Sequence, residues 1–456
     1  MPISPARKIA FEVLRRVESE GAYASDLLHA ELSPDLRRED AALSTEISLG
    51  VLRRRRLLDF LLERHLKKSP ARLDLPVLLA LRVGLYQILF LQKIPARAAV
   101  NESVELVKRA RKSSAAPLVN AVLRRAAESS RVSVESLLPP GLGAAERLGI
   151  LHSHPTWLVE RWLGRFGEAR TIALLEANNR APRLSCALRD STAREEVFAS
   201  LSKAGLHLSE GALLRDAFAV SGGSPSHAVA FRNGDFSIQD EASQAVPQLL
   251  AVQPGDRVLD LCAAPGGKTA PLARAAASSG LVVAADRHAH RLAAMKDQFR
   301  RLHLDSVRLV ELDAALPLPF AARFDRILVD APCTGTGTLA RHPEIRWRLA
   351  PESIAELQSL QLTILVRALD QLAPHGRLVY STCSLEPEEN EAVVEAALAQ
   401  FPALRLAPRE EVLRTLAPHL APGVSAESLF DPRGFFRTLP GENPCDGFFA
   451  AVVSRD

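Results

Sequence analysis

Apolar residues in the first 130 positions recur at the spacing of an amphipathic helix. One helical face is formed by Ile9, Ala10, Val13, Leu14 and Val17. Gly21 follows as a stop signal. Similar patterns occupy residues 43–66, 76–91, 97–112 and 117–128. No strand pattern interrupts them, so we expect residues 1–130 to form an all-α bundle.

The pattern changes after this bundle. Residues 129–145 are rich in Ser, Pro and Gly, which is typical of a linker. Residues 146–235 mix a long helical stretch, WLVERWLGRFGEARTIALLEANN, with the strand-like pieces RLSCALRD and AFAVSG. This mixture predicts a small α+β module.

From residue 236 to 456, apolar strands alternate regularly with helical stretches. The expected strands are RVLDL (257–261), LVVAAD (281–286), VRLVEL (307–312), DRILVD (325–330) and GRLVYS (376–381). Such alternation indicates a doubly wound, Rossmann-like α/β sheet. FFAAVV (448–453) follows a DG turn, and FFRTLP (435–440) is its candidate partner. A terminal hairpin of this kind is typical of class I methyltransferases.

Composition limits the class of protein to which this multidomain chain can belong. The 456 residues are 47% hydrophobic and 24% charged, as in ordinary globular proteins. No 18-residue apolar run and no leader pattern occur, so we expect neither a membrane span nor export. Five cysteines without a CxxC pair indicate free thiols in a reducing, cytoplasmic compartment rather than disulfides or a metal site.

Charge is distributed unevenly along the chain. Residues 1–130 hold 23 Lys and Arg against 15 Asp and Glu, a net charge of +8. The remaining residues hold 34 against 38, a net charge of −4. The basic N-terminal third therefore indicates a module that docks on a polyanion.

The stretch VLDLCAAPGGKT (258–269) reads as a strand, a tight loop and a helix start. Gly266 and Gly267 would let the backbone approach a ligand closely. A P-loop would need glycine where Cys262 stands, and the G-x-G-x-x-G fingerprint of dinucleotide sites is absent. Asp286 lies 20 residues after Gly266, at the spacing expected of a carboxylate that binds ribose hydroxyls.

These features favour S-adenosylmethionine over ATP and NAD. Asp260, Asp286 and Asp313 would each end a parallel strand, at the edge where such sheets bind ligands. Asp260 and Asp313 would flank the amino-acid and adenine ends of the cofactor. Lys268 would position either the cofactor or a substrate base.

Two cysteines follow successive strands of the expected sheet. DAPC (330–333) and STCS (381–384) should face one crevice, which would bring Asp330, Cys333 and Cys383 together. A thiolate that adds to carbon 6 of a pyrimidine makes carbon 5 able to attack a methyl donor. Asp330 would stabilise the activated ring at its N3/N4 edge. A flipped nucleotide would be required. The residues alone do not decide which thiol attacks.

Two further segments carry charge near this site. RHPEIRWR (341–348) combines Arg341, His342, Arg346 and Trp347, a set suited to phosphate contact and base stacking on RNA. Glu386, Glu388 and Glu389 are expected to begin a helix, where the dipole favours acidic residues, and we assign them no catalysis.

Residues 236–456 closely resemble the RsmB (Sun/Fmu) branch of the RsmB/NOP2 family of RNA cytosine-5 methyltransferases. The matching pieces, in family order, are SIQDEASQAV, LDLCAAPGGKT, VVAAD, FDRILVDAPCTGTG, RHPEIRW, LVYSTCSLEPEEN and DGFFAAVV. IPARAAVNESVELVK and PLVNAVLRR resemble a NusB-like RNA-binding domain, and HPTWLVERWLGRFGE with ANNRAP resembles the family's middle module. RLSCALRD (183–190) departs from the family's usual strand, which leaves that module's contacts open.

The resemblance implies roles for individual residues. The cofactor would be bound by Cys262, Ala263, Ala264, Pro265, Gly266, Gly267, Lys268, Asp286, Asp313 and Asp330. DNA cytosine-5 methyltransferases attack with the Pro-Cys cysteine, which would be Cys333. The RNA family attacks with the Thr-Cys cysteine, which implies that Cys383 is the nucleophile and that Cys333 assists product release.

The resemblance also implies a substrate, 16S ribosomal RNA, and we expect a cytoplasmic monomer without a metal. Two alternatives stay open. One is the same chemistry on transfer RNA, and the other is a non-catalytic RNA-binding factor in ribosome assembly.

Overall fold

The computed structural model describes residues 3–32, 36–129 and 132–455. The chain divides into two compact units. Unit 1 comprises Met1–Ala181 together with Leu339–Arg348, and unit 2 comprises Pro182–Thr338 together with Leu349–Asp456. A ten-residue segment from within the methyltransferase-like sequence thus belongs to the N-terminal unit.

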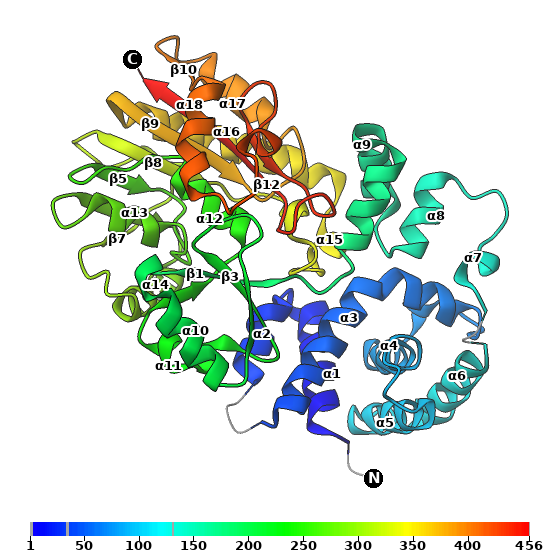
Figure 1. Cartoon of the computed structure of the whole chain (residues 1–456). Coiled ribbons are helices and arrows are strands. Elements are labelled where there is room, and N and C mark those ends of the chain that lie inside the picture. The colour runs from blue at the N-terminus through cyan, green and yellow to red at the C-terminus, as the bar shows by residue number, and fades with distance from the viewer. Residues whose placement is uncertain (1–2, 33–35, 130–131, 456) are drawn as a thin grey trace. The chain divides into compact units, whose positions relative to one another are not determined.

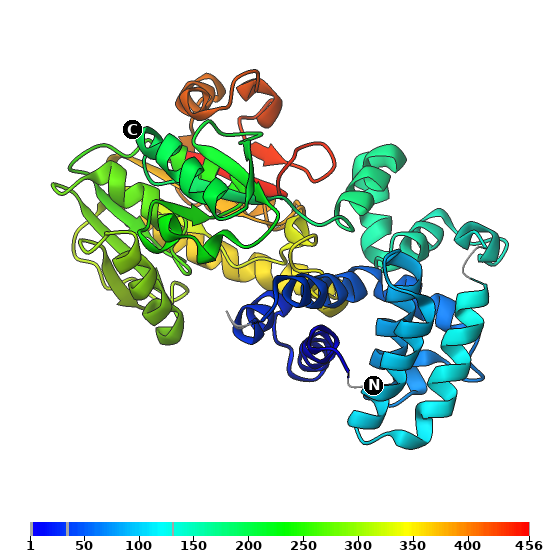
Figure 2. The ribbon, with the colours of Figure 1, turned by 60° about the horizontal axis from the view of Figure 1, so that its bottom comes forward.

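The expected all-α bundle is confirmed in unit 1 (Figures 1 and 2). Its longer helices are α1 (Pro5–Glu20), α2 (Ala24–Glu31), α3 (Arg38–Glu63), α4 (Leu75–Phe90), α5 (Ala96–Arg109) and α6 (Ala116–Glu128). Helix α4 is apolar around its whole circumference and is buried from Val77 to Gln87, so it forms the centre of the bundle. Gly50 of α3 lies against Tyr86 of α4, where a Cβ atom would come within 2.0 Å of the ring.

Three more helices follow in unit 1, namely α7 (Val134–Leu137), α8 (Ala144–Leu151) and α9 (Thr156–Ala177). Residues 130–131 of the expected linker lie outside the described residues. Arg56 of α3 donates through its backbone N–H to Ser153 Oγ (2.8 Å) and through its guanidinium to the carbonyl of His154 (2.6 Å). These bonds hold the turn between α8 and α9 against the bundle. The expected module at 146–235 is therefore divided, with its long helix in unit 1 and its sheet in unit 2.

The smaller sheet of unit 2 has four antiparallel strands in the order β2-β3-β1-β4. They are β1 (Leu184–Leu188), β2 (His207–Glu210), β3 (Ala217–Ser221) and β4 (Phe236–Ile238). Two helices, α10 (Arg194–Lys203) and α11 (Val229–Arg232), add apolar side chains to the core of this sheet. The strands expected from RLSCALRD and AFAVSG are confirmed as β1 and β3.

The larger sheet of unit 2 has the order β10-β12-β9-β8-β5-β6-β7, and β11 pairs with β12. Its strands are β5 (Arg257–Asp260), β6 (Leu281–Asp286), β7 (Arg308–Glu311), β8 (Phe324–Asp330), β9 (Leu372–Thr382), β10 (Leu404–Leu406), β11 (Phe436–Thr438) and β12 (Phe448–Arg455). Strands β5 to β9 pair in parallel, whereas β12 runs antiparallel to β9. The predicted hairpin of FFRTLP with FFAAVV is confirmed, because β11 and β12 pair antiparallel.

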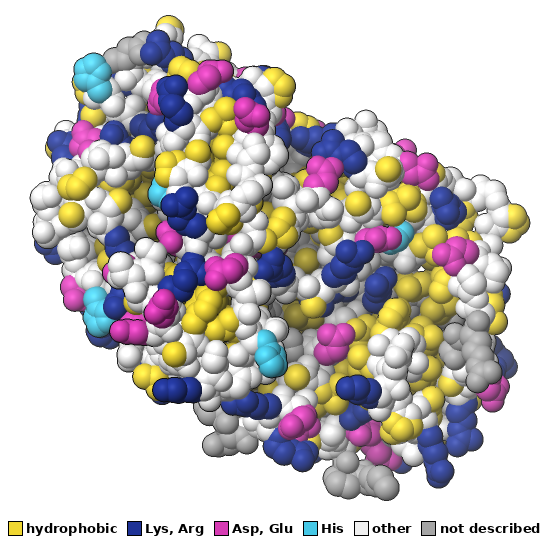
Figure 3. Space-filling model, in the orientation of Figure 1, with side chains coloured by type: hydrophobic (Ala, Val, Ile, Leu, Met, Phe, Trp, Pro, Cys, Tyr) yellow, Lys and Arg dark blue, Asp and Glu magenta, His cyan; other side chains and the backbone are white. Residues whose placement is uncertain are grey.

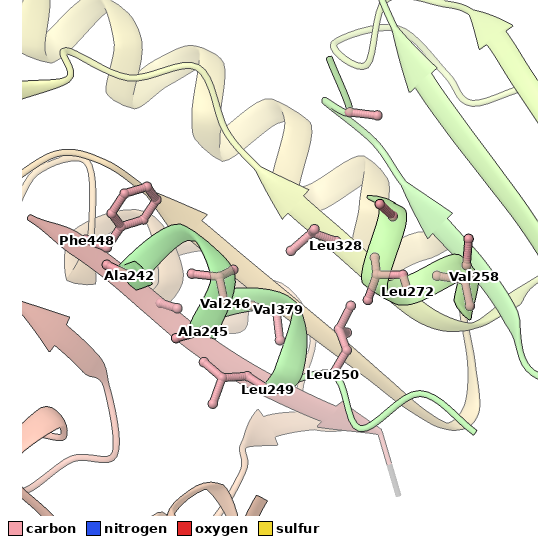
Figure 4. Packing of buried hydrophobic residues seen from close by; sticks show 14 of the residues in the cluster. Ala242, Ala245, Val246, Leu249, Leu250, Val258, Leu272, Leu328, Val379 and Phe448 are labelled. Atoms are coloured by element: carbon pink, nitrogen blue, oxygen red, sulfur yellow. The ribbon is translucent and has the colours of Figure 1, made fainter. Parts of the chain in front are cut away.

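Helices cover both faces of this sheet. The covering helices are α12 (Glu241–Gln248), α13 (Thr269–Ala276), α14 (Ala289–Arg301) and α18 (Arg409–Leu416) on one face, and α16 (Pro351–Asp370) and α17 (Glu391–Leu398) on the other. Side chains alternate along each strand, so Val258 and Leu328 pack on the first face while Leu259 and Val329 pack on the second. Figure 4 shows Val246 of α12 among the side chains of the first face. Both faces are buried, which explains the nearly continuous apolar runs in the strands.

Among the residues that the structure describes, no helix combines the length and the apolar character that crossing a membrane requires.

Candidate active site

The two cysteine loops of unit 2 leave neighbouring parallel strands at the same edge of the sheet. Asp330, the last residue of β8, pairs in register with Ser381 of β9. Ser381 Oγ donates a hydrogen bond of 2.8 Å to Asp330 Oδ1. Past these residues the chains converge, and the Sγ atoms of Cys333 and Cys383 lie 3.3 Å apart. Asp330 and both thiols therefore lie together, as the strand order of the sheet requires.

The two thiol groups form a hydrogen bond with each other. Their hydrogen bond raises the pKa of the Cys333 thiol well above its ordinary value, and burial and the charge of Glu389 raise it further. Cys333 consequently retains its proton at neutral pH. Either sulfur can be the donor of this hydrogen bond.

Lys268 contributes a positive charge at this edge. Its Nζ lies 2.7 Å from Asp330 Oδ2, and the ammonium also lies 4.9 Å from the centre of the Phe448 ring. Ser381 and Lys268 thus occupy one oxygen each of the Asp330 carboxylate. This arrangement fixes the orientation of Asp330 beside the thiols.

The loop between β5 and α13 contains residues 262–268. Gly266 has φ 94°, and a Cβ atom there would come within 2.7 Å of the Phe299 ring, so glycine is required on both counts. The loop is held by the next strand, because Ala264 N donates to Asp286 Oδ2 (3.2 Å). The Arg291 guanidinium also holds this loop, because it donates a hydrogen bond to the Ala264 carbonyl (2.8 Å).

The three aspartates expected at strand ends differ in their surroundings. Asp260 is fully buried, and burial raises its pKa to about 7. Its Oδ2 accepts a bond of 2.6 Å from Thr269, but its buried Oδ1 has no protein partner in the described part of the chain. Asp286 is buried at the end of β6, and Asp313 is partly exposed and caps a turn through the backbone N–H of Ala315 (2.9 Å).

The remaining cysteines lie in other surroundings. Burial raises the pKa of the Cys262 and Cys445 thiols well above the ordinary value, and that of Cys186 to about 12. None of these three sulfurs has a thiol partner within the described residues.

The expectation that Glu386, Glu388 and Glu389 begin a helix is wrong. Helix α17 starts at Glu391, and Glu389 lies in the preceding turn with its side chain fully buried. Its carboxylate accepts hydrogen bonds from Thr334, Ser384 and Gln361. No periodic signal in the sequence points to its burial, because Glu389 lies in a turn outside helix α17.

The expected RNA contact of Arg346 is corrected by the structure, because this residue is fully buried in unit 1, whereas Trp347 is half-buried and its RNA contact stays a prediction. Arg346 is 0% exposed and donates to the carbonyls of Ser153 (3.2 Å), Asn178 (3.0 Å) and Leu339 (3.1 Å). Burial lowers its pKa well below the usual value.

The Trp347 indole donates to the carbonyl of Leu52 (2.8 Å), so this side chain is engaged within the fold. Arg341 and His342 are partly buried in the same segment, and burial lowers the pKa of His342. Their contact with RNA stays a prediction. The four residues Arg341, His342, Arg346 and Trp347 belong to unit 1, whereas the two thiols belong to unit 2.

A parallel sheet extended by an antiparallel terminal strand, with the loop of residues 262–268 at its carboxyl edge, defines a class I methyltransferase. Comparison with known proteins gives the family. Residues 247–454 match the family described as "16S rRNA methyltransferase RsmB/F", residues 4–128 match the NusB family, and residues 154–226 match the ferredoxin-like domain of RsmF/B-like methyltransferases.

Similar proteins cover the whole chain. A protein of Bacillus subtilis named "Probable ribosomal RNA small subunit methyltransferase B" is 32% identical over 100% of both chains. The "Ribosomal RNA small subunit methyltransferase B" of Klebsiella pneumoniae is 32% identical over 98% of both chains. The crystal structure of PH0851 matches with a TM-score of 0.81 at 26% identity over the full length of both chains. The chain belongs to the RsmB/F methyltransferase family, with an N-terminal NusB domain.

Members of this family are methyltransferases that use S-adenosyl-L-methionine and act on RNA. The described residues fit this cofactor. The orphaned Oδ1 of Asp260 would accept a bond from its amino group, and the carboxylate of Asp286 has lone pairs left for hydroxyl groups.

Proposed function

We propose that this protein methylates carbon 5 of a cytosine in 16S ribosomal RNA and that Cys383 is the attacking nucleophile. The observation that carries the proposal is the thiol pair, 3.3 Å apart, beside an aspartate held by a lysine. A lone thiol has many uses, but two thiols and an oriented carboxylate match the needs of a reaction in which a base is attacked and then released.

Cys383 would add to carbon 6 of the base. A sulfur–carbon bond forms, the C5–C6 double bond breaks, and carbon 5 becomes nucleophilic. Bound S-adenosylmethionine supplies the electrophilic methyl group that carbon 5 takes up. A base then removes the C5 proton, the double bond re-forms, and the thiolate of Cys383 leaves. The contact of Cys333 with the Cys383 sulfur supports its assignment to the release half of this sequence.

Asp330 would bind the N3/N4 edge of the cytosine. Its carboxylate is oriented by Ser381 on one oxygen and by Lys268 on the other, so little reorganisation is needed when the base arrives. Lys268 would also keep the carboxylate from being repelled by charge that develops on the ring.

Unit 1 would hold the RNA by its phosphates. Exposed basic side chains on or beside α5 and α6 are Lys108, Arg109, Arg111, Arg124 and Arg125. Figure 3 shows dark-blue side chains gathered at the lower right, where Figure 1 places these two helices. Phosphate contacts of this kind supply affinity without reading sequence. The free thiols of the active site suit a reducing, cytoplasmic compartment.

The test is methyl transfer from labelled cofactor by the purified full-length chain. Protein-free 16S RNA, assembled small subunits and total tRNA are offered separately, and the product nucleoside is identified by mass spectrometry. We expect 5-methylcytidine in the 16S RNA. Methylation of tRNA alone would overturn the substrate, methylation of another base would overturn the chemistry, and no transfer to any RNA would overturn the enzyme.

The thiol roles are tested in the same assay. We expect Cys383→Ala to abolish both methyl transfer and the denaturant-resistant RNA adduct. Cys333→Ala should instead accumulate the adduct, because release is impaired. Cys445→Ala, a cysteine outside the hydrogen-bonded pair, is the matched control and should behave as wild type. An adduct that is lost in Cys333→Ala but kept in Cys383→Ala would reverse the two assignments.

A further inference from the structure

Cys333 and Cys383 are close enough to each other for oxidation to join them. Both side chains are partly exposed, and their Sγ atoms lie 3.3 Å apart. Because a disulfide joins two sulfurs at about 2.05 Å, the pair lies only about 1.2 Å beyond bonding distance. Rotation of the two side chains covers a distance of this size, and a small oxidant can reach both sulfurs from solvent.

The loops that carry the two thiols are bound to each other on both sides of the pair. Before the thiols, the backbone N–H of Ala331 donates to the carbonyl of Ser381 (2.9 Å). Beyond them, the backbone N–H of Gly337 donates to the carbonyl of Cys383 (2.9 Å). Folding has therefore already met the entropic cost of bringing the two sulfurs together.

A buried carboxylate ties the loops together immediately beside the sulfurs. Glu389 accepts hydrogen bonds from the backbone N–H of Thr334 (2.8 Å) and from the hydroxyls of Thr334 and Ser384. Thr334 follows Cys333 in the chain, and Ser384 follows Cys383. The tie thus lies one residue beyond each sulfur and holds the two loops at one separation.

The other three cysteines offer no comparable pair. Cys186, Cys262 and Cys445 have no thiol partner within the described residues, and Cys186 is buried as well. An oxidant therefore meets one pair of thiols that is ready to cross-link within the chain. In reducing compartments such disulfides are usually transient, so a bridge formed here would be reversible.

We propose that Cys333 and Cys383 form a reversible disulfide under oxidising conditions and that this bridge switches methyl transfer off. The effect on methyl transfer rests on the proposed function, in which one of these two sulfurs attacks the base, whereas the formation of the bridge does not. A sulfur in a disulfide has no thiolate to add to carbon 6. The bridge occupies both sulfurs, so the switch works whichever of them is the nucleophile.

The oxidant is a peroxide or a small disulfide such as oxidised glutathione. Hydrogen peroxide oxidises one thiol to a sulfenic acid and is reduced to water. The second thiol then attacks that sulfur, the S–S bond forms, and a second water leaves. With oxidised glutathione, the first thiol forms a mixed disulfide and releases one reduced glutathione. The second thiol then displaces the other glutathione, which takes up the remaining proton.

The bridge leaves the groups expected to bind the cofactor in place. Asp260, Asp286 and the loop of residues 262–268 include neither sulfur of the pair. We therefore expect the oxidised protein to bind S-adenosylmethionine as the reduced protein does. Loss of methyl transfer with cofactor binding retained distinguishes a switch from general oxidative damage.

The experiment oxidises the full-length protein with oxidised glutathione. Remaining thiols are blocked with N-ethylmaleimide, and unreduced peptides are mapped by mass spectrometry. We expect one internal disulfide between Cys333 and Cys383, loss of methyl transfer, unchanged affinity for S-adenosylmethionine by calorimetry, and full recovery of transfer after dithiothreitol. The absence of this bridge, a bridge at other cysteines, or a bridged protein that still transfers methyl groups would overturn the proposal.

Single variants test the second step of the oxidation. Cys333→Ser and Cys383→Ser should each stop at a mixed disulfide with glutathione on the remaining thiol, because the sulfur that displaces glutathione is missing. Cys445→Ser lies outside the pair and is the matched control, which should form the internal bridge as the wild type does. An equal yield of mixed disulfide in the wild type and in the two single variants would contradict a poised pair.

Failure of the proposed function would give a different result. Reduced wild type would then transfer no methyl group to any RNA, although the bridge would still form and reverse. The bridge would stand in that case, and the claim that it switches methyl transfer would fall. Active reduced protein in which neither hydrogen peroxide nor oxidised glutathione produces the bridge would instead overturn this inference and leave the proposed function intact.

Discussion

Asp260 lies at the end of β5 with its side chain completely buried and one oxygen unpartnered in the described residues. Burial raises its pKa to about 7 from an ordinary value of 3.8. Between these two pH values the folded protein holds a proton that the unfolded chain has lost. Raising the pH through this window therefore destabilises the fold at this residue.

We predict that Asp260→Asn removes this dependence. In the absence of ligand, the free energy of unfolding of the variant should rise relative to that of the wild type as the pH increases from 4 to 8. The gain should be at most about 4 kcal/mol, because each unit of pKa shift corresponds to about 1.36 kcal/mol. Denaturant unfolding at several pH values measures the difference. Asp305→Asn, at an exposed position, is the control and should show no such trend. A constant difference between Asp260→Asn and wild type at all pH values would contradict the buried proton.

Among the elements, the segment Leu339–Arg348 has the least expected position. The segment follows Thr338 in the methyltransferase sequence but belongs to unit 1, where its arginines donate hydrogen bonds at the ends of helices. Arg346 binds the carbonyl of Asn178, which caps α9, and Arg348 binds the carbonyls of Val17 and Ala22 at the end of α1. Helix ends carry unsatisfied carbonyls and a partial negative charge, so guanidinium groups stabilise them.

We predict that Arg346→Met destabilises the protein by about 2–4 kcal/mol, because several buried carbonyls lose their donor. Chemical denaturation measures the loss. Arg97→Met replaces an exposed arginine of α5 and should change stability by less than about 0.5 kcal/mol. If Arg346 instead contacted RNA, the variant would lose RNA affinity at unchanged stability, and that result would restore the sequence-based expectation.

For the whole molecule, we expect the uneven charge along the chain to determine how it binds RNA. A net charge of +8 over residues 1–130 stands against −4 over the rest, so electrostatic attraction to phosphate is concentrated in unit 1. Chemistry and RNA affinity are thereby assigned to different units of the chain.

We predict that the double substitution Arg109→Glu and Arg124→Glu weakens RNA binding. The dependence of the logarithm of affinity on the logarithm of salt concentration should become shallower by about 2, one unit for each lost phosphate contact. Filter binding at several salt concentrations measures it. The double substitution Lys203→Glu and Lys296→Glu, at two exposed positions of unit 2, is the control of equal charge change, and an equal loss of affinity in it would contradict a role for unit 1.

Much of the architecture could be predicted from the sequence because it depends on local periodicity. Helical spacing indicated the bundle, and strand alternation indicated a sheet whose order follows from right-handed parallel connections. The convergence of Asp330, Cys333 and Cys383 followed from the same rule, since carboxyl ends of neighbouring parallel strands share an edge. The cofactor loop was visible as a Gly-rich strand-to-helix turn.

The tertiary structure alone decided which charged residues are buried. Glu389 and Arg346 look like surface residues in the sequence, because a charge in a polar segment usually lies in water. Their partners are remote, with Thr334 separated from Glu389 by 55 positions and Asn178 from Arg346 by 168. Periodicity reports only on a residue's own element, whereas the free energy of burying a charge depends on donors and acceptors that folding brings from elsewhere.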